Sequence, residues 1–284
     1  MIVQAPAKLN LCLFVGPTRD DGLHELVSLF EPLELADELL IEDAEGGEDE
    51  VVVEGVEQPD LTARALAALR EAGWGRPPVR IEVRKRVPVA AGLGGGSADA
   101  AAVLRLARGE VEGLRAIAAG LGADVPSQLD PRPCLVGGAG ELVEPILPPA
   151  EHAVVLITFE EGLGTAEVYG EADRMGTPRG ESELEVFRRK LRDATVTGAS
   201  PLTYPENLIN DLEPAAIALR PEIGDALEAL REAGADRALV TGSGPTAFGL
   251  FGDRSAAEAA AESLRERHPT AVATAPLGAG EGTA

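Results

Sequence analysis

Cysteine is scarce in this chain of 284 residues, and its two cysteines, Cys12 and Cys134, both lie in apolar stretches. Two isolated cysteines in such surroundings are typical of buried, reduced thiols, not of a disulfide framework or a metal site. The sequence also lacks an apolar run of about 18 residues that could cross a membrane. Its first residues have neither the basic start nor the long apolar core of a signal peptide. We therefore expect a cytoplasmic enzyme.

Positive charge is scarce as well. The chain has 25 basic and 48 acidic residues, a net charge of −23, and its only three lysines are Lys8, Lys85 and Lys190. A surface this acidic repels nucleic acids and anionic membranes at long range, which argues against either as a partner. An acidic protein that binds an anionic small molecule must build a local positive site. Two of the three lysines stand beside the motifs described below.

The apolar pattern of the first half predicts both strands and helices. Residues 9–15 are rich in strand-forming side chains, and residues 79–84 alternate apolar and charged ones, so both segments are expected to be half-buried strands. Residues 61–72 carry apolar side chains at helical spacing. Asp60 is the predicted N-cap of that helix and Gly73 its stop.

A proline cluster at residues 145–150 interrupts the pattern before a new apolar strand at residues 153–158. Such breaks are typical of domain boundaries, so we predict two domains, residues 1–150 and 151–284. The glycine-rich end of the chain, from about residue 276, is expected to be disordered.

The end of the second half has a recognisable element order. It predicts a helix at 221–233, strands at 238–241 and 247–251, a helix at 255–267 and a last strand at 271–275. An α–β–β–α–β order of this kind is typical of a ferredoxin-like α+β sandwich.

The strongest local signal is PVAAGLGGGSA at residues 88–98, which continues into an alanine-rich stretch. Four glycines fall within five positions, at Gly92 and Gly94–Gly96, and Ser97 is the predicted N-cap of the following helix. Bare backbone amides at the positive end of a helix form a cradle for anions. With Lys85 shortly before the run, we interpret it as a phosphate-binding loop. A tight strand-to-helix turn without a ligand is the structural alternative.

This loop matches neither of the two common nucleotide motifs. A Walker loop ends in Gly-Lys-Ser or Gly-Lys-Thr, and no lysine follows these glycines. The dinucleotide fingerprint requires a glycine where Ser97 stands. The loop therefore indicates phosphate binding of another kind.

Four weaker signals surround the loop. Lys8 and Asn10 lie two residues apart at the start of a strand, and Asp124 is held between a glycine and a proline. His24 follows a turn, and residues 241–246 (TGSGPT) form either a hairpin turn or a second phosphate-facing loop. Each has an ordinary explanation, because surface lysines are usually solvated and aspartates at such turns usually act as caps.

The order of these motifs resembles the GHMP kinase superfamily. PAKLNL, DGLHEL, the glycine loop, GADVP and TGSGP follow one another as they do there, and the resemblance covers nearly the whole chain. PAKLNL and DGLHEL point to the members that act on a diphosphocytidyl ester of a branched sugar alcohol, on the non-mevalonate route to isoprenoid precursors.

The resemblance implies an α+β protein with the two-domain GHMP kinase fold. Its N-terminal domain would be a ribosomal-protein-S5-domain-2-like α/β domain and its C-terminal domain a ferredoxin-like α+β domain. ATP and a small-molecule substrate would meet in the cleft between them. Mg²⁺ is implied as a cofactor by the chemistry of phosphoryl transfer and not by a cluster of carboxylates in the sequence.

The resemblance also assigns roles to residues. Lys8 and Asp124 match the catalytic pair, in which Asp124 accepts the proton of the attacking hydroxyl and Lys8 holds both groups. The residues implied to bind ATP are Pro88, Val89, Ala90, Ala91, Gly92, Leu93, Gly94, Gly95, Gly96, Ser97 and Ala98. Those implied to bind the diphosphocytidyl substrate are Asn10, His24, Lys85, Thr165 and Tyr169.

The chain departs from the family pattern at several points. Leu23 replaces a tyrosine that stacks on the cytosine, and Asp60 to Thr62 replaces a segment that contacts the adenine. Ala98 replaces the second serine of the loop, and the stretch before GADVP is several residues short. Because Lys8 and Asp124 are both present, we expect an active enzyme.

Three alternatives remain open at this point. The chain could be another kinase of the superfamily, acting on homoserine or a mevalonate derivative, but DGLHEL argues against that. It could be a non-catalytic nucleotide sensor on the same fold, or a structural domain that binds no nucleotide. A shift of the melting temperature by ATP would separate the last possibility from the others.

Overall fold

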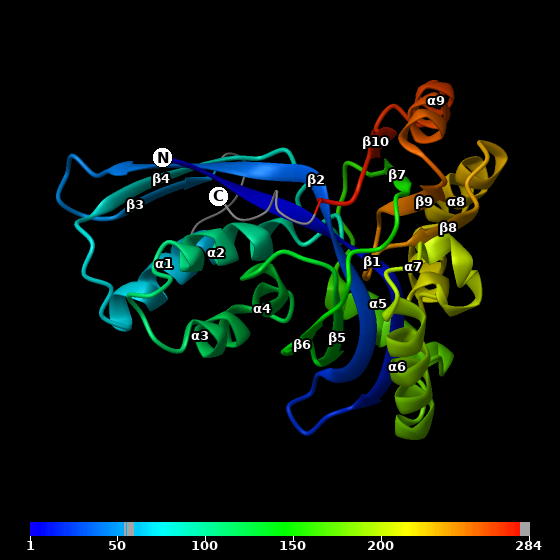
Figure 1. Ribbon diagram of the computed structural model, residues 1–284, viewed down its shortest axis with the longest axis horizontal. Coiled ribbons are helices and arrows are strands. Elements are labelled where there is room, and N and C mark those ends of the chain that lie inside the picture. The colour runs from blue at the N-terminus through cyan, green and yellow to red at the C-terminus, as the bar shows by residue number, and fades with distance from the viewer. Residues whose placement is uncertain (54, 56–59, 279–284) are drawn as a thin grey trace.

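The protein folds into two α+β halves, each built on its own sheet. The fold is seen in a computed structural model that describes residues 1–53, 55 and 60–278 (Figure 1). The half formed by the first part of the chain lies on the left of the view, and the second half lies on the right.

The first sheet is centred on the long strand β2 (His24–Asp43), which pairs along one edge with β1 (Ile2–Thr18). On the other side, β2 pairs with two strands in succession. The strand order is β3-β4-β2-β5-β6, with β3 at Glu50–Val53, β4 at Val79–Arg84, β5 at Cys134–Gly138 and β6 at Leu142–Pro145. Among the described strands of this sheet, the β3–β4 pair is parallel and the other pairs are antiparallel.

Two helices pack side by side under this sheet, α1 (Leu61–Glu71) and α2 (Gly95–Arg105) (Figure 1). The Asp60 side chain accepts a hydrogen bond from the Ala63 N–H at 2.9 Å, so Asp60 is the N-cap of α1, as predicted. The alanines of α2 are fully buried, and their small side chains let the helix lie close to α1 and β1. The short helices α3 (Leu114–Leu121) and α4 (Val125–Gln128) complete this half.

The second sheet has the strand order β10-β7-β9-β8, and all its pairs are antiparallel. This order, with helices between β7 and β8 and between β9 and β10, confirms the predicted ferredoxin-like arrangement. Its strands are β7 (Ala153–Ile157), β8 (Arg237–Val240), β9 (Ala247–Phe251) and β10 (Val272–Thr274). The helices are α5 (Thr165–Met175), α6 (Glu181–Thr195), α7 (Glu213–Leu219), α8 (Glu222–Glu232) and α9 (Arg254–Leu264), with 3₁₀ turns at Pro201–Thr203 and Pro205–Asn207.

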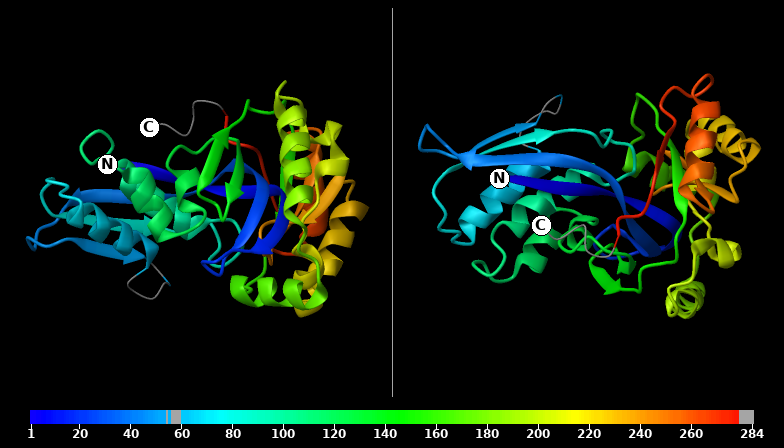
Figure 2. Two further views of the ribbon diagram at one scale, coloured as in Figure 1. Left: turned by 90° about the horizontal axis from the view of Figure 1, so that it is seen from below. Right: turned by 45° about the horizontal axis from the view of Figure 1, so that its top comes forward.

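The two halves share a core because β1 and β2 extend past the first sheet's helices (Figure 2). Leu13 of β1 and Phe30 of β2 belong to the same buried cluster as residues of β7, α8 and α9. A boundary between residues 150 and 151 stays a prediction, although β7 is the first strand of the second sheet.

Three smaller predictions can be compared directly with the structure: the free cysteines, the lack of a membrane-spanning segment and the disordered tail. Both cysteines are buried and free, as expected. The described helices include none long and apolar enough to cross a membrane. The predicted disordered tail begins too early, because Pro276 pairs with Leu33 and the Leu277 N–H donates to the Pro32 carbonyl at 2.8 Å. The rest of that tail, residues 279–284, lies outside the described residues.

Candidate active site

A cleft of about 960 Å³ lies between the two halves of the molecule. It is lined by the start of β1, the turn before β2, the glycine loop, the segment before α4, the face of α5 and the turn between β8 and β9. The structure brings together here every residue predicted to be catalytic or substrate-binding: Lys8, Asn10, His24, Lys85, Asp124, Thr165 and Tyr169. Of the predicted ATP-binding residues, Leu93 and Ala98 are buried under the loop and do not line the cleft.

Lys8 and Asp124 form an ion pair in the cleft. The Lys8 Nζ atom lies 3.2 Å from Asp124 Oδ2, although the residues are far apart in the sequence. The Lys8 side chain is 5% exposed and the Asp124 side chain 30% exposed, so the carboxylate is the more open partner. Asp124 makes no side-chain cap on α4, which removes the ordinary structural explanation for an aspartate at this turn.

A chain of buried hydrogen bonds fixes the position of Lys8. Its Nζ donates to Asn10 Oδ1, and Asn10 Nδ2 donates to Ser28 Oγ at 2.9 Å. The Ser28 hydroxyl in turn donates to the Cys12 carbonyl at 2.5 Å. Because both ends of the Asn10 amide are engaged, its oxygen is held toward Lys8. Asn10 therefore orients Lys8, and its predicted contact with a substrate stays a prediction.

The glycine loop packs its backbone against both lysines. Gly94 has a φ of +69° and is the N-cap of α2, and a Cβ atom there would lie 2.8 Å from Lys8 Cγ. At Gly95, a Cβ atom would lie 3.2 Å from Lys85 Nζ. Only glycine fits the left-handed conformation and the close approach of Lys8 without strain. The two lysines thus flank the first turn of α2.

The prediction that Ser97 caps α2 is wrong. The helix begins at Gly95, so Ser97 lies inside its first turn and makes no cap. The reason is that Gly94 can adopt the left-handed conformation, which starts the helix two residues earlier than a serine cap would. The bare amides of Gly95 and Gly96 are consequently the ones exposed at the helix N-terminus.

The turn between β8 and β9 faces the same loop. A Cβ atom on Gly92, whose φ is +77°, would lie 2.7 Å from the Thr241 carbonyl oxygen. Asn210 Nδ2 fixes the turn by donating to the carbonyls of Val240 at 2.7 Å and Gly242 at 2.8 Å. TGSGPT is thus a turn between antiparallel strands, and Gly242 and Ser243 of this turn line the cleft. That the turn faces a phosphate stays a prediction.

Lys85 is bound by two buried carboxylates. Its Nζ lies 2.5 Å from Asp37 Oδ2 on β2 and 2.7 Å from Asp99 Oδ2 on α2. Asp37 Oδ1 also accepts the backbone N–H groups of Arg86 at 2.5 Å and Val87 at 2.8 Å. Burial disfavours the charged lysine, but Asp99 and Asp37 together raise the pKa of Lys85.

The far end of the cleft is formed by His24 and helix α5. The His24 and Tyr169 rings lie 5.1 Å apart with a 32° tilt, and His24 Nε2 is 3.3 Å from Asp173 Oδ2. His24 Nδ1 lies 3.0 Å from the Gly16 carbonyl oxygen, which can only accept, so this nitrogen is the donor. Leu23, 54% exposed, presents an aliphatic side chain to the cleft.

The cations of the cleft are few and already paired. Among the described residues that line it, no arginine is present, and Lys8 and Lys85 each contact a carboxylate. The positive end of α2 is therefore an important part of what can attract a phosphate here.

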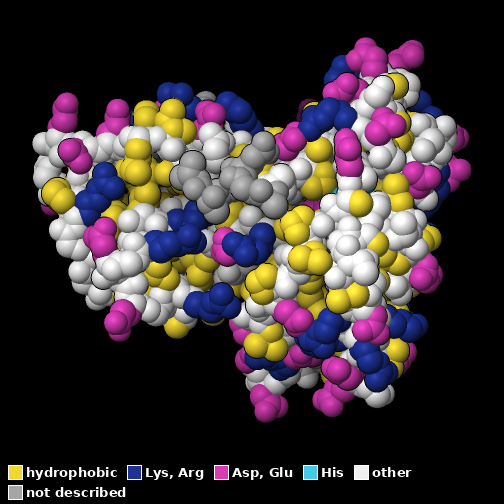
Figure 3. Space-filling view, viewed as in Figure 1, with side chains coloured by type: hydrophobic (Ala, Val, Ile, Leu, Met, Phe, Trp, Pro, Cys, Tyr) yellow, Lys and Arg dark blue, Asp and Glu magenta, His cyan; other side chains and the backbone are white. Residues whose placement is uncertain are grey.

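On the face seen in Figure 3, acidic side chains are spread over both halves with basic ones among them, in a protein whose net charge is −23.

The residues present do not build a cage for a metal ion. Within the described part of the chain, no group of three or more His, Cys, Asp or Glu side chains is placed to hold one. Mg²⁺ commonly enters kinase sites with nucleotide phosphates and water as most of its ligands. A metal that entered the cleft with such phosphates would therefore have few protein ligands among the described residues.

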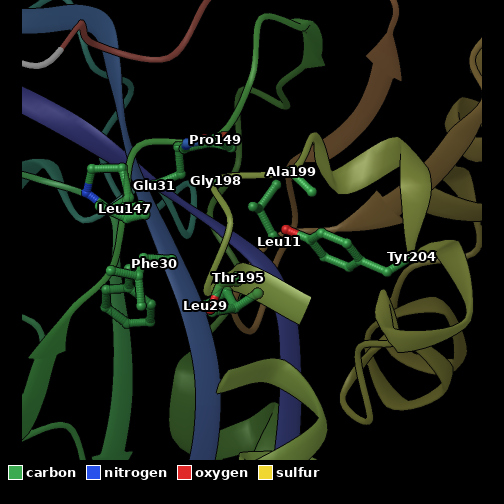
Figure 4. A pocket seen from close by; sticks show the side chains of 12 residues that line it. Leu11, Leu29, Phe30, Glu31, Leu147, Pro149, Thr195, Gly198, Ala199 and Tyr204 are labelled. Carbon is green, nitrogen blue, oxygen red and sulfur yellow. The ribbon is translucent and has the colours of Figure 1, made fainter. Parts of the chain in front are cut away.

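A second pocket has a much smaller volume than the cleft. Figure 4 shows the Tyr204 side chain extending toward Leu11. The volume of this pocket is about 10 Å³. That volume is close to the limit for a single water molecule. Glu31, which also lines it, contacts His152 Nε2 through Oε2 at 3.0 Å, and both side chains are buried.

Sequence reasoning missed the groups that support the predicted ones. Ser28, Asp37 and Asn210 are hydrophilic residues inside long apolar elements or loops, and nothing local distinguishes them. Asp99 did carry a signal, because it is a lone charge within a run of buried alanines. These side chains bind Asn10, Lys85 and the turn between β8 and β9.

Comparisons with known proteins show which family this chain resembles. The profile described as "GHMP kinases N terminal domain" matches residues 60–137, and "GHMP kinases C terminal" matches residues 202–270. A 4-diphosphocytidyl-2-C-methyl-D-erythritol kinase of Thermobifida fusca is 40% identical, covering 93% of this chain and 91% of the relative. The corresponding kinase of Kineococcus radiotolerans is also 40% identical, covering 86% of this chain and 79% of the relative.

Solved structures give the same result. A crystal structure of 4-(cytidine 5'-diphospho)-2C-methyl-D-erythritol kinase superposes with a TM-score of 0.79 at 36% identity, covering 98% of this chain and 100% of that chain. A homoserine kinase from Cytophaga hutchinsonii superposes with a TM-score of 0.75 at 17% identity, covering 99% of this chain and 96% of that one. The second likeness shows the shared fold alone.

Proposed function

The chain belongs to the 4-diphosphocytidyl-2-C-methyl-D-erythritol kinases of the GHMP superfamily, and we propose how its residues carry out that reaction. The enzyme transfers a phosphoryl group from ATP to 4-diphosphocytidyl-2-C-methyl-D-erythritol, a step of the non-mevalonate (methylerythritol phosphate) pathway. We propose that the acceptor is the 2-hydroxyl. The observation that carries the mechanism is the Lys8–Asp124 pair, 3.2 Å apart beside the glycine loop.

Asp124 is the proposed general base. Its side chain is open to the cleft, so it can accept the proton of a hydroxyl bound there. The Lys8 ammonium has three donors. Two are directed at Asp124 and Asn10, which leaves one for the attacking hydroxyl or the transferred phosphoryl group. A cation held rigidly at this point stabilises the charge that develops during transfer.

The glycine loop is the proposed ATP phosphate site. Gly95 and Gly96 at the start of α2 line the cleft and have no side chains to block the approach of a phosphate, and the helix dipole favours an anion there. Gly94 also lies against Lys8. Phosphates bound on the loop would therefore sit next to the catalytic pair, as phosphoryl transfer requires.

The His24 end of the cleft is the proposed site of the cytidine base. Tyr169 and His24 supply ring faces against which a planar base can stack. Thr165 Oγ1 lies 3.1 Å from Ser243 Oγ, so α5 is tied to the turn between β8 and β9 beside this end. With Leu23 in place of an aromatic residue, stacking would come from the α5 side.

Mg²⁺ is the proposed metal, and it would supply charge neutralisation of the nucleotide phosphates when bound. Because the described residues offer no carboxylate cage, we assign no protein ligand to it. The proposed partners are ATP and the diphosphocytidyl substrate, without nucleic acid or membrane. The proposed location is the cytoplasm.

Two of the earlier alternatives lose support. Homoserine kinase shares the fold at 17% identity, whereas the diphosphocytidyl kinases reach 36% to 40%. A non-catalytic sensor would not need a lysine and an aspartate held together in an open cleft by a buried hydrogen-bond chain.

The experiment that tests the proposed function is a comparison of acceptors. Purified protein with ATP and Mg²⁺ is given 4-diphosphocytidyl-2-C-methyl-D-erythritol, homoserine, mevalonate or no acceptor, and ADP release is followed. We expect release with the first acceptor alone, and phosphorus NMR of the product should show a new monoester on the 2-hydroxyl. Faster release with homoserine or mevalonate, or equal release without an acceptor, would contradict the proposal.

A further inference from the structure

The Asp37–Lys85–Asp99 cluster has two carboxylates but a single lysine to balance their negative charge. Lys85 can balance one carboxylate, yet both aspartates are almost fully buried, with Asp37 at 0% and Asp99 at 1% exposure. The cluster also lies at the first turn of α2, where we propose that phosphates bind. An unmatched buried negative charge at a phosphate site costs energy twice, once for burial and once for repulsion.

The hydrogen bonds indicate which carboxylate remains ionised. Asp37 accepts two backbone N–H groups at Oδ1 and Lys85 at Oδ2, and such bonds favour the charged form. Asp99 accepts only Lys85, through Oδ2. Its buried Oδ1 atom has no hydrogen-bond partner. Asp37 lies within hydrogen-bonding reach of Asp99, so a proton on Asp99 would gain an acceptor there.

We propose that Asp99 is a proton-binding positioning residue: with Asp37 it clamps Lys85 over the first turn of α2, and it takes up a proton when phosphate occupies the glycine loop. The inference rests on the proposed function of that loop. Protonation leaves Lys85 balanced by Asp37 alone, which removes the surplus negative charge beside the ligand. The proton comes from solvent, and no bond is made or broken in the ligand.

The direction of the pKa change agrees with this geometry. Burial raises the pKa of Asp99 to about 7, the Lys85 charge opposes the change, and the Asp37 charge adds to it. A phosphate at the helix N-terminus adds further negative charge, and it competes for the ammonium of Lys85. Both effects raise the pKa of Asp99 again, so binding near neutral pH is coupled to proton uptake.

Other charged groups near the loop do not replace Asp99 in this role. The charged side chains that line the cleft around the glycine loop, besides Asp99, are Lys8, Asp60, Lys85 and Asp124, and Asp37 on β2 is bonded to Lys85. Other charged side chains on α2 and on the helices packed against it are exposed or engaged elsewhere: Arg64 and Glu71 of α1 and Arg115 of α3 are exposed, Arg70 of α1 pairs with Asp49, and Arg105 of α2 donates to the Gln4 and Gln128 carbonyls. Of these, Lys85 and Asp37 are the ones that act on the Asp99 carboxyl.

The test measures protons taken up on nucleotide binding. Binding of Mg²⁺-ADP to wild type and to Asp99→Asn is followed by calorimetry at pH 7.0 to 8.5, in buffers of different ionisation enthalpy. The asparagine mimics the protonated acid, so protons released by the ligand itself are common to both proteins. Near neutral pH, we expect wild type to take up about half a proton more per bound nucleotide than Asp99→Asn does. Above neutral pH, we expect the affinity of wild type for Mg²⁺-ADP to weaken by up to about tenfold per pH unit.

Glu213→Gln is the matched control. Glu213 is another carboxyl whose pKa is raised by burial, but it binds the Val240 N–H outside the cleft, so this variant should retain the wild-type proton uptake. If Asp99→Asn does not fold, Asp37→Asn serves instead. Loss of the Asp37 charge lowers the pKa of Asp99, so the midpoint of the uptake must move to lower pH.

The outcomes separate this inference from the proposed function. Nucleotide binding with equal proton uptake in wild type and Asp99→Asn, or an unmoved midpoint in Asp37→Asn, would overturn the role of Asp99 and leave the kinase assignment intact. A wild-type protein that binds no nucleotide would overturn the phosphate site itself, and the inference with it.

Discussion

Replacement of Lys8 by methionine is the substitution that separates catalysis from folding best. Methionine keeps a straight apolar stem of similar length against Gly94, so the packing at the loop is retained. The Asp124 carboxylate left behind is 30% exposed, so water can solvate it and no buried charge is stranded. We therefore expect Lys8→Met to fold and to melt within a few degrees of wild type.

The expected catalytic loss follows from the charge that is removed. Two unit charges 3.2 Å apart at an effective dielectric constant of about 20 interact by about 5 kcal/mol, an upper bound for what the ammonium gives a developing charge at similar range. Removal of one preorganised donor typically costs about 10²–10³-fold in kcat. We expect kcat to fall about 10³-fold, with the Kd of Mg²⁺-ATP changed by less than about tenfold.

The assay is substrate-dependent ADP release, with nucleotide affinity measured separately by calorimetry. Lys190→Met is the matched control, because Lys190 lies over the Phe187 ring at 5.3 Å and does not line the cleft. It should retain full activity. A fall in kcat of less than tenfold for Lys8→Met, or an equal fall for Lys190→Met, would refute the role given to Lys8.

Three further predictions concern the base site, the thiols and a buried pair. Leu23→Tyr should restore a stacking face worth about 1 kcal/mol and lower KM for the diphosphocytidyl substrate about fivefold; an unchanged KM would argue against a base at this end. Burial raises the pKa of the Cys12 and Cys134 thiols to about 12, so a disulfide reagent at pH 8 should modify them only after denaturation. Although burial opposes it, Glu31 raises the pKa of His152, so the stability this pair provides is complete below about pH 6.5 and is lost as pH rises through the folded-state pKa. In urea unfolding, Glu31→Gln should therefore cost more stability at pH 6 than at pH 9, and an equal cost would contradict the pairing.

The sequence predicted those parts of the fold that depend on local pattern. The helix behind Asp60 and the strand at residues 79–84 have the expected bounds to within a residue, because capping and alternation act over a few residues. The ferredoxin-like order followed from alternating helix and strand signals near the end of the chain. Ser97 was misjudged because a left-handed glycine can start a helix as well as a serine cap can.

The site residues divide in the same way, into those that a local motif predicts and those that it does not. Lys8, Asp124 and His24 could be named because each belongs to a short motif whose order along the chain is distinctive. Asp37 could not, because it reaches Lys85 only through sheet pairing that places Glu38 opposite Arg84. Contacts made by strand register leave no trace in the sequence around either partner.

The most direct test of the account is the activity of Asp124→Asn. Wild type and variant are mixed with ATP, Mg²⁺ and 4-diphosphocytidyl-2-C-methyl-D-erythritol, with Asp130→Asn as the control, since Asp130 pairs with Arg132 at 2.8 Å outside the cleft. The account predicts acceptor-dependent ADP release by wild type and Asp130→Asn, and a loss of about 10²-fold or more in Asp124→Asn with nucleotide binding retained. Wild-type release that survives in Asp124→Asn would contradict the proposed base, and no release by wild type would contradict the assigned reaction.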